Sequence, residues 1–213
     1  MTIRAQAKRR AVRGGEDRAG WQIAAALARD VDGGFERFLN AYQDRVYGYA
    51  LNLTANPSVA EEVAQDAFVA AYRALRTYPP ARRRALALRA WLFAIVLNRV
   101  RNLARSPAAK QLSLDLARDG RAALDVPDRA AGPAASLERN ESLAELRGAV
   151  ARLPLRYRGA IVLRHIEERG YAEIASILGQ PAGTVKSNVH RGLALLRADL
   201  QRRSHGIEPS ALA

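Results

Sequence analysis

Residues 171–191 have the sequence YAEIASILGQPAGTVKSNVHR, and the expected architecture can be worked out from this stretch. Its apolar residues recur at helical spacing on both sides of Gly179, which stands where a helix C-cap needs a left-handed residue. Pro181 follows at the entrance of the next helix, where its missing backbone N–H costs nothing. We therefore predict a short helix, a tight turn and a second helix. This is the helix-turn-helix arrangement, whose second helix can enter the DNA major groove.

The second helix of this motif is predicted to have an inner and an outer face. The inner face holds the helix to its domain through the apolar residues Val185, Val189, Leu193, Leu196 and Leu200. The outer face carries the polar residues Lys186, Ser187, His190 and Arg191. Because such side chains bind base edges and phosphates, we predict that this face binds duplex DNA. A helical hairpin with a solvated basic face is the alternative.

Two more helices are expected before the motif. One carries apolar residues from Leu143 to Leu153 and stops at Pro154, and the next covers Arg156–Glu167. Together with the motif they form a predicted domain over residues 137–203, followed by a tail over 204–213. Residues 107–136 hold three prolines and no stable apolar period, which is typical of a flexible linker.

Three helices are predicted in the N-terminal half, over residues 21–106. The first buries an apolar stripe that begins at Phe35 and ends near Ala55. The second starts at a capping box of Ser58 and Glu61 and runs to Tyr78, and the third covers residues 88–105. Residues 1–20 are read as a disordered basic arm. The predicted fold class is all-α, with two small helical domains joined by a flexible linker.

Composition limits the possible functions. The 213 residues include 34 Lys and Arg against 21 Asp and Glu, a net charge of +13 that favours a polyanionic partner such as nucleic acid. Cysteine is absent, which excludes disulfides, thiolate zinc sites and a cysteine nucleophile. No apolar run is long enough for a membrane span and no secretory signal is evident, so we expect a cytoplasmic protein.

The second predicted helix has a mixed polar face. Glu62, Gln65 and Asp66 lie at helical spacing on the side opposite its alanine-rich core face. Phosphates would be repelled by this acidic patch, so it suits a basic protein partner better than DNA. An ordinary solvated face is the other interpretation.

Charge is strongly segregated after Asp66. Residues 67–114 contain ten Arg or Lys and no Asp or Glu, a pattern typical of a nucleic-acid surface. Within this run the third helix is predicted to expose Asn98, Arg99, Asn102 and Arg105, which suit phosphates and unpaired bases.

Three motifs in order along the chain resemble the sigma-70 family of RNA polymerase initiation factors, in its extracytoplasmic function group. Residues 61–68 (EEVAQDAF) look like the polymerase-binding helix of the family. Residues 91–98 (WLFAIVLN) look like its promoter-melting helix, and residues 183–191 (GTVKSNVHR) like its minus-35 reading helix. The resemblance covers about residues 35–105 and 137–203.

The resemblance implies a role for each surface. The clamp helices of the polymerase large subunit would contact Glu62, Gln65, Asp66 and Tyr72, and the flap is a further expected contact. The minus-10 element would face Asn98, Arg99, Asn102 and Arg105, and the loop Pro79–Arg89 would help to capture a base flipped from the opened strand. The minus-35 duplex would be read by Lys186, Ser187, His190 and Arg191. An anti-sigma factor is an expected partner.

Two other classes of protein remain as alternatives. A self-sufficient helix-turn-helix regulator would bind a palindromic operator without polymerase. A nuclease could hold a metal through Glu61, Glu62 and Asp66. The sequence shows no phosphate loop, zinc-ligand spacing or nucleophile elbow, so we predict no catalytic residue, no cofactor and no metal.

Overall fold

The computed structural model describes residues 19–105 and 145–204, and every regular element within these ranges is helical. This confirms the predicted all-α class. Residues 1–18 of the predicted arm, the whole predicted linker and residues 205–213 lie outside the described part of the chain. None of the described helices is both long and apolar enough to cross a membrane.

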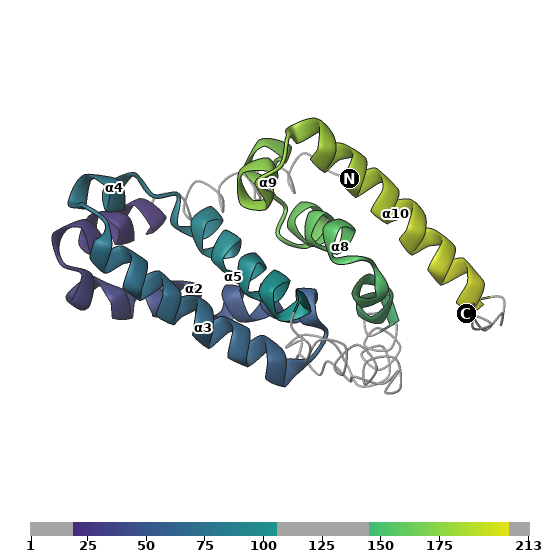
Figure 1. Ribbon diagram of the computed structural model, residues 1–213, viewed down its shortest axis with the longest axis horizontal. Helices are drawn as coiled ribbons and strands as arrows, with labels where there is room; N and C mark the ends of the chain where they lie inside the picture. The colour runs from purple at the N-terminus through teal and green to yellow at the C-terminus, as the bar shows by residue number, and fades with distance from the viewer. Residues whose placement is uncertain (1–18, 106–144, 205–213) are drawn as a thin grey trace, which may run out of the picture.

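The N-terminal half is a helical bundle (Figure 1). Its helices are residues 19–29, α2 (Val31–Thr54), α3 (Pro57–Thr77), α4 (Pro80–Ala85) and α5 (Leu88–Arg105). The long helices α2, α3 and α5 pack on one another. Fully buried Phe38, Leu75 and Leu92, one from each, lie in the core between them. The predicted C-terminal ends of α2, α3 and α5 agree with the structure to within a residue or two, whereas α2 begins at Val31, four residues before the predicted stripe.

The helix over residues 19–29 was not predicted. It buries Ile23, Ala24 and Leu27 against the bundle. It stops at Asp30, whose carboxylate accepts hydrogen bonds from the backbone N–H groups of Asp32 and Gly33, both at 3.0 Å, and so caps α2. Small alanines carry much of its apolar face, which is why the pattern was weak in the sequence.

The predicted cap of α3 was wrong. Asn56 rather than Ser58 is the N-cap, and its side-chain oxygen accepts from the Val59 backbone N–H at 3.1 Å. Pro57 then occupies the first turn, because its fixed φ suits that position and its missing N–H leaves no donor to satisfy.

The segment 79–89 is not the simple loop that was predicted. Proline again starts a helix, and α4 covers six of these residues. Only Leu86 and Ala87 separate α4 from α5. The three arginines at 82–84 therefore lie on a helical turn rather than on an extended loop.

Five helical segments lie within residues 145–204 of the C-terminal half. They are residues 145–152, α8 (Leu155–Ile161), the π-helix η1 (Val162–Ile166), α9 (Tyr171–Leu178) and α10 (Ala182–Ser204). The single helix predicted for residues 156–167 thus changes to π geometry at Val162. Helix α10 packs very closely on α8, since a Cβ added at Gly192 would lie 2.6 Å from Ile161 Cδ1.

The two halves pack against each other through α9 and α5 (Figure 1). Arg101 of α5 donates to the Leu178 carbonyl at the end of α9, at 3.4 Å. Arg158 of α8 donates to the carbonyl of Leu53 in α2. The buried apolar residues of both halves form one continuous cluster.

Candidate protein and nucleic-acid interfaces

The predicted helix-turn-helix is present. Helix α9 ends at Gly179, which has left-handed dihedrals of φ 63° and ψ 40°, and its N–H donates to the Ala175 carbonyl. A residue with a Cβ would be strained in this conformation, so glycine sets the direction in which the chain leaves α9. Helix α10 begins directly after Pro181.

The outer face of α10 is as predicted. The side chains of Lys186, Ser187, His190 and Arg191 are all exposed. Inward, Val185 and Val189 are buried, but Leu193 of the predicted inner face is 36% exposed. The outer face therefore offers two fixed cations, a hydroxyl and an imidazole to a ligand from one rigid helix.

Asn188 fixes the start of this helix against the turn. Its side chain is buried and donates from Nδ2 to Gln180 Oε1 at 3.0 Å. Lys186 is also positioned, with its Nζ 5.7 Å from the centre of the Tyr171 ring in α9. These contacts link α10 to both the turn and α9.

The acidic face of α3 is also exposed as predicted. Glu62, Gln65 and Asp66 point away from the bundle, while Tyr72 lies half-buried further along the same face. The Tyr72 hydroxyl donates to Asp32 Oδ1 of α2 at 2.6 Å. This hydrogen bond ties the C-terminal end of the predicted polymerase-binding face to α2.

An apolar groove runs beside this face and was not predicted. It has a volume of about 840 Å³ and lies between α2 and α3. Phe35, Leu39 and Tyr47 of α2 form one wall, and Phe68 and Val69 of α3 form the other. Val69 is 47% exposed. The signal in the sequence was the position of the apolar Val69 on the polar face of its helix. The α2 wall could be recognised only once the two helices had been placed.

On α5 the predicted residues Asn98, Asn102 and Arg105 are exposed. Arg99 is only partly exposed, and its guanidinium lies 3.8 Å from the Asp66 carboxylate of α3. The predicted protein-binding and nucleic-acid faces therefore meet at this ion pair.

The basic residues of α4 lie near the other end of α5. The Arg82 guanidinium stacks on the Tyr78 ring, 3.7 Å from its centre. The Trp91 ring of α5 lies beside Tyr78, with the ring centres 6.1 Å apart. Aromatic and cationic side chains are thus concentrated where α3, α4 and α5 meet.

Two family models match the chain, Sigma-70 region 2 over residues 38–111 and Sigma-70 region 4 over residues 143–196. The RNA polymerase sigma factor CnrH of Cupriavidus metallidurans is 35% identical over 150 residues, which cover 68% of this chain and 74% of CnrH. The chain belongs to the sigma-70 family. The resemblance found in the sequence is thereby confirmed.

Other relatives place this sigma factor in the extracytoplasmic function group. SigW of Bacillus subtilis is 29% identical, with 78% of this chain and 89% of SigW covered. SigE of Mycolicibacterium smegmatis is 30% identical over 83% of this chain, which spans 65% of the length of SigE. Both of these relatives are named as sigma factors of this group.

Solved structures share the fold of this sigma factor. CnrH in complex with the cytosolic domain of CnrY has a TM-score of 0.59 and 26% identity, covering 86% of this chain and 97% of CnrH. The sigma factor RpoE of Bartonella quintana, in complex with the anti-sigma factor NepR, has a TM-score of 0.58 at 22% identity. RpoE supports the fold alone.

The metal-dependent nuclease alternative gains no support from the geometry. Within residues 19–105 and 145–204, no three His, Asp or Glu side chains are grouped so that they could hold a metal. Glu61, Glu62 and Asp66 are all exposed on the surface of α3.

Proposed function

We propose that this sigma factor joins core RNA polymerase to promoter DNA through three surfaces of the described chain. The polymerase-binding surface consists of Glu62, Gln65, Asp66 and Tyr72. The minus-10 surface consists of Asn98, Arg99, Asn102 and Arg105. The minus-35 surface consists of Lys186, Ser187, His190 and Arg191. The observation that carries the proposal is the separation of charge between the acidic face of α3 and the basic faces of α5 and α10.

The α3 surface suits a protein rather than a nucleic acid. Its two carboxylates would repel phosphates, whereas the neighbouring α2–α3 groove offers apolar area that a helical partner can bury. Together these features fit basic and apolar side chains on the clamp helices of the polymerase large subunit.

The α5 surface suits melted DNA. Amide side chains at 98 and 102 can hydrogen-bond base edges, while the guanidinium groups at 99 and 105 can neutralise phosphates. To contact a phosphate, the Arg99 guanidinium would move away from the Asp66 carboxylate and weaken their ion pair.

The α10 surface suits duplex DNA. An exposed helix that follows a tight turn can lie in the major groove, where Arg and Lys bind guanine edges. We further propose that residues 21–106 and 137–203 are separate units joined by residues 107–136, so that each can bind its own promoter element.

Two further partners belong to this proposal. The C-terminal unit would contact the polymerase flap, and an anti-sigma factor would bind the chain, by analogy with CnrH in complex with the cytosolic domain of CnrY. The chain would act in the cytoplasm by binding alone, with no catalytic residue, cofactor or metal of its own.

The test is reconstitution with core polymerase. The purified chain is mixed with core enzyme and a genomic promoter library, and transcript 5′ ends are mapped. We expect a discrete set of start sites that is absent with core enzyme alone. Start sites indistinguishable from those of core enzyme would refute the proposal. Tight binding of the free chain to a palindromic operator would instead support the regulator alternative.

A further inference from the structure

Tyr72 forms one end of the α2–α3 groove, and two residues that do not line the groove hold its side chain. The Tyr72 hydroxyl donates to Asp32 Oδ1 of α2 at 2.6 Å and accepts from Arg76 Nη1 of α3 at 3.2 Å. The Arg76 guanidinium also lies over the Tyr72 ring, 5.7 Å from its centre. A carboxylate and a guanidinium therefore fix the position of one phenol.

The hydroxyl of Tyr72 has little capacity left for a ligand. A phenol has one proton to donate, and this proton is directed at the Asp32 carboxylate. The short distance of 2.6 Å is typical of a hydrogen bond to an ionised acceptor, which is stronger than one between neutral groups. What Tyr72 offers to a ligand of the groove is its ring, which packs edge-on against Phe35 with the ring centres 5.0 Å apart.

The position of Asp32 is set by the start of α2. Its backbone N–H donates to Asp30 Oδ1 at 3.0 Å, within the N-cap of that helix. The helix dipole favours an acid in the first turn, but it does not explain a hydrogen bond to a residue forty positions away. Asp32 is exposed, lies outside the lining of the groove, and precedes the matched family region, which begins at residue 38.

We propose that Asp32 is a positioning residue for the binding of core polymerase, because it holds Tyr72 against Phe35 and so gives the groove a fixed aromatic wall. The inference rests on the proposed function, in which Tyr72 contacts the polymerase. Without the hydrogen bond to Asp32, the Tyr72 side chain would have to be ordered when the partner binds. Ordering one such side chain at an interface corresponds to a loss of about 2- to 10-fold in affinity.

The first measurement is the affinity of the full chain for core polymerase, obtained by competition with the labelled parent chain. Asp32→Ala is expected to weaken binding by about 2- to 10-fold. Asp32→Asn keeps an oxygen that can accept the Tyr72 proton, so we expect its affinity to stay within about twofold of the parent. Both variants remove the same charge from the first turn of α2. Equal losses in the two would trace the effect to that charge and overturn the proposal.

A double-mutant cycle then tests the link between Asp32 and Tyr72. Tyr72→Phe keeps the ring and removes the hydroxyl, so we expect it to weaken polymerase binding about as much as Asp32→Ala does. The double variant should bind no more weakly than either single variant, because both changes break the same hydrogen bond. Additive losses would overturn the proposal, since the hydroxyl would then serve the polymerase directly.

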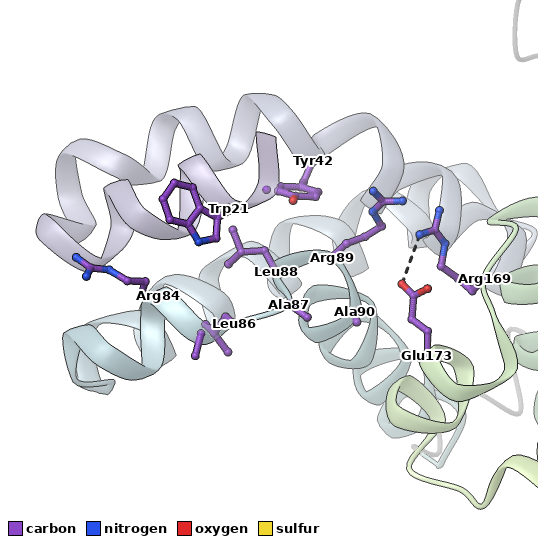
Figure 2. A pocket seen from close by; sticks show the side chains of 12 residues that line it. Trp21, Tyr42, Arg84, Leu86, Ala87, Leu88, Arg89, Ala90, Arg169 and Glu173 are labelled. Carbon is purple, nitrogen blue, oxygen red and sulfur yellow. Dashed lines mark hydrogen bonds and ion pairs between the residues drawn. The ribbon is translucent and has the colours of Figure 1, made fainter. Parts of the chain in front are cut away.

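Two control variants test for general effects. Asp44→Ala removes another exposed carboxylate of α2. Trp21→Ala changes the helix over residues 19–29 on another side, where Trp21 is 64% exposed and lines a separate pocket of about 530 Å³ at the junction of α4 and α5 (Figure 2). We expect both controls to bind core polymerase like the parent chain. A loss in either that equals the loss in Asp32→Ala would refute a specific role for Asp32.

The parent chain separates the two possible failures. Urea denaturation first establishes that each variant is folded. A parent chain with no affinity for core polymerase would refute the proposed function. A parent chain that binds, together with an Asp32→Ala variant of equal affinity, would refute only the positioning role of Asp32.

Discussion

At the scale of single residues, Glu62 and Arg191 separate the two proposed binding activities. Both side chains are exposed, and they lie on α3 and α10, in different halves of the chain. Asp66 is a less clean choice, because an arginine there would also repel Arg99, whose guanidinium lies 3.8 Å from the present carboxylate.

We predict that Glu62→Arg lowers the affinity for core polymerase by roughly tenfold or more, since a like charge then faces a basic partner. We predict that Arg191→Ala leaves this affinity unchanged and weakens promoter-specific transcription by about 5- to 100-fold. Polymerase pull-down and run-off transcription measure the two effects. Similar losses of polymerase affinity in both variants would contradict the assignment of the surfaces.

Tyr49 offers a prediction about stability. Its ring is fully buried and stacks on Phe93, with the ring centres 4.5 Å apart. No described residue hydrogen-bonds its buried hydroxyl, and burial raises the pKa of that group. An unsatisfied buried hydroxyl lowers the free energy of unfolding by about 1–3 kcal/mol, whereas tyrosine and phenylalanine both provide the ring packing.

We therefore predict that Tyr49→Phe raises the free energy of unfolding, by about 1 kcal/mol. Urea denaturation of the full chain at neutral pH measures the change. Tyr42→Phe is the comparison, because Tyr42 is also buried but engages in a further contact. A Tyr49→Phe variant less stable than the parent chain would show that the hydroxyl is satisfied after all.

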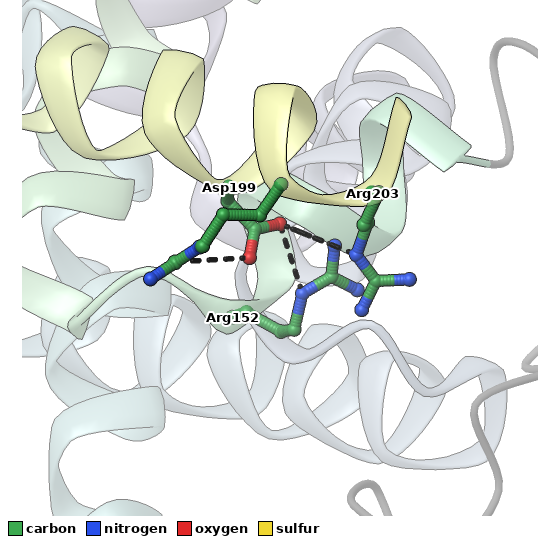
Figure 3. Close-up of polar contacts among 4 residues, drawn as sticks. Arg152, Asp199 and Arg203 are labelled. Carbon is green, nitrogen blue, oxygen red and sulfur yellow. Dashed lines mark hydrogen bonds and ion pairs between the residues drawn. The ribbon is translucent and has the colours of Figure 1, made fainter. Parts of the chain in front are cut away.

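At the scale of helices, an ion-pair cluster joins residues 145–152 to the end of α10 (Figure 3). Asp199 accepts hydrogen bonds from Arg152 Nε at 3.2 Å and Nη2 at 2.6 Å. Arg202 and Arg203 each approach the same carboxylate to 3.6 Å. Burial raises the pKa of Asp199, but the hydrogen bonds and charge of Arg152, with the charges of Arg203 and Arg202, outweigh it and leave the pKa lowered.

Because folding lowers the pKa of this carboxylate, its ionised form stabilises the folded state at pH values above the unfolded pKa of about 3.9. This stabilisation is lost as the pH falls through the pKa of the folded state. We predict that Asp199→Asn lowers the free energy of unfolding at pH 7 by about 1 kcal/mol. The difference from the parent chain should shrink as pH falls below about 4. Denaturation curves at several pH values test this, with Arg202→Gln as a milder control. A difference that is independent of pH would exclude the electrostatic explanation.

At the scale of the whole molecule, the C-terminal half lies against α5, the helix of the proposed minus-10 surface. Arg158 of α8 makes a second contact between the halves, to α2. Burial lowers its pKa to about 10, so it remains charged at neutral pH. It donates to the carbonyls of Leu53 in the N-terminal half and Leu153 in its own half, in the latter case at 2.9 Å from Nη2.

We predict that Arg158→Met loosens the contact between the halves, because the Leu53 carbonyl loses a charged donor worth about 1.5–3 kcal/mol. The chain has no cysteine, so labels can be placed on Ala81→Cys and Ala198→Cys, both at exposed positions. Energy transfer between the labels should fall in the Arg158→Met variant. Arg156→Met is the control, because it removes an exposed arginine whose guanidinium stacks on Tyr157. We expect it to leave the energy transfer unchanged. Equal transfer in all variants would exclude a bridging role for Arg158.

Local sequence determined the helices, the turn and the outward faces. Helical periodicity depends on residues three and four apart, so the bounds of α5 and α9 could be predicted, and so could the exposed residues of α3 and α10. Gly179 was recognisable because a left-handed C-cap favours glycine. The family resemblance rested on the same local motifs.

Tertiary structure alone decided what those helices build together. The α2–α3 groove and the pocket at the junction of α4 and α5 each need side chains from elements whose crossing no local pattern specifies. The cap at Asn56 was missed because Asn56 and Ser58, two residues apart, could each serve as a cap. The contact from Arg158 to Leu53 spans 105 residues of sequence. Helical periodicity shows that a face is buried, but close packing of complementary side chains determines which other face covers it.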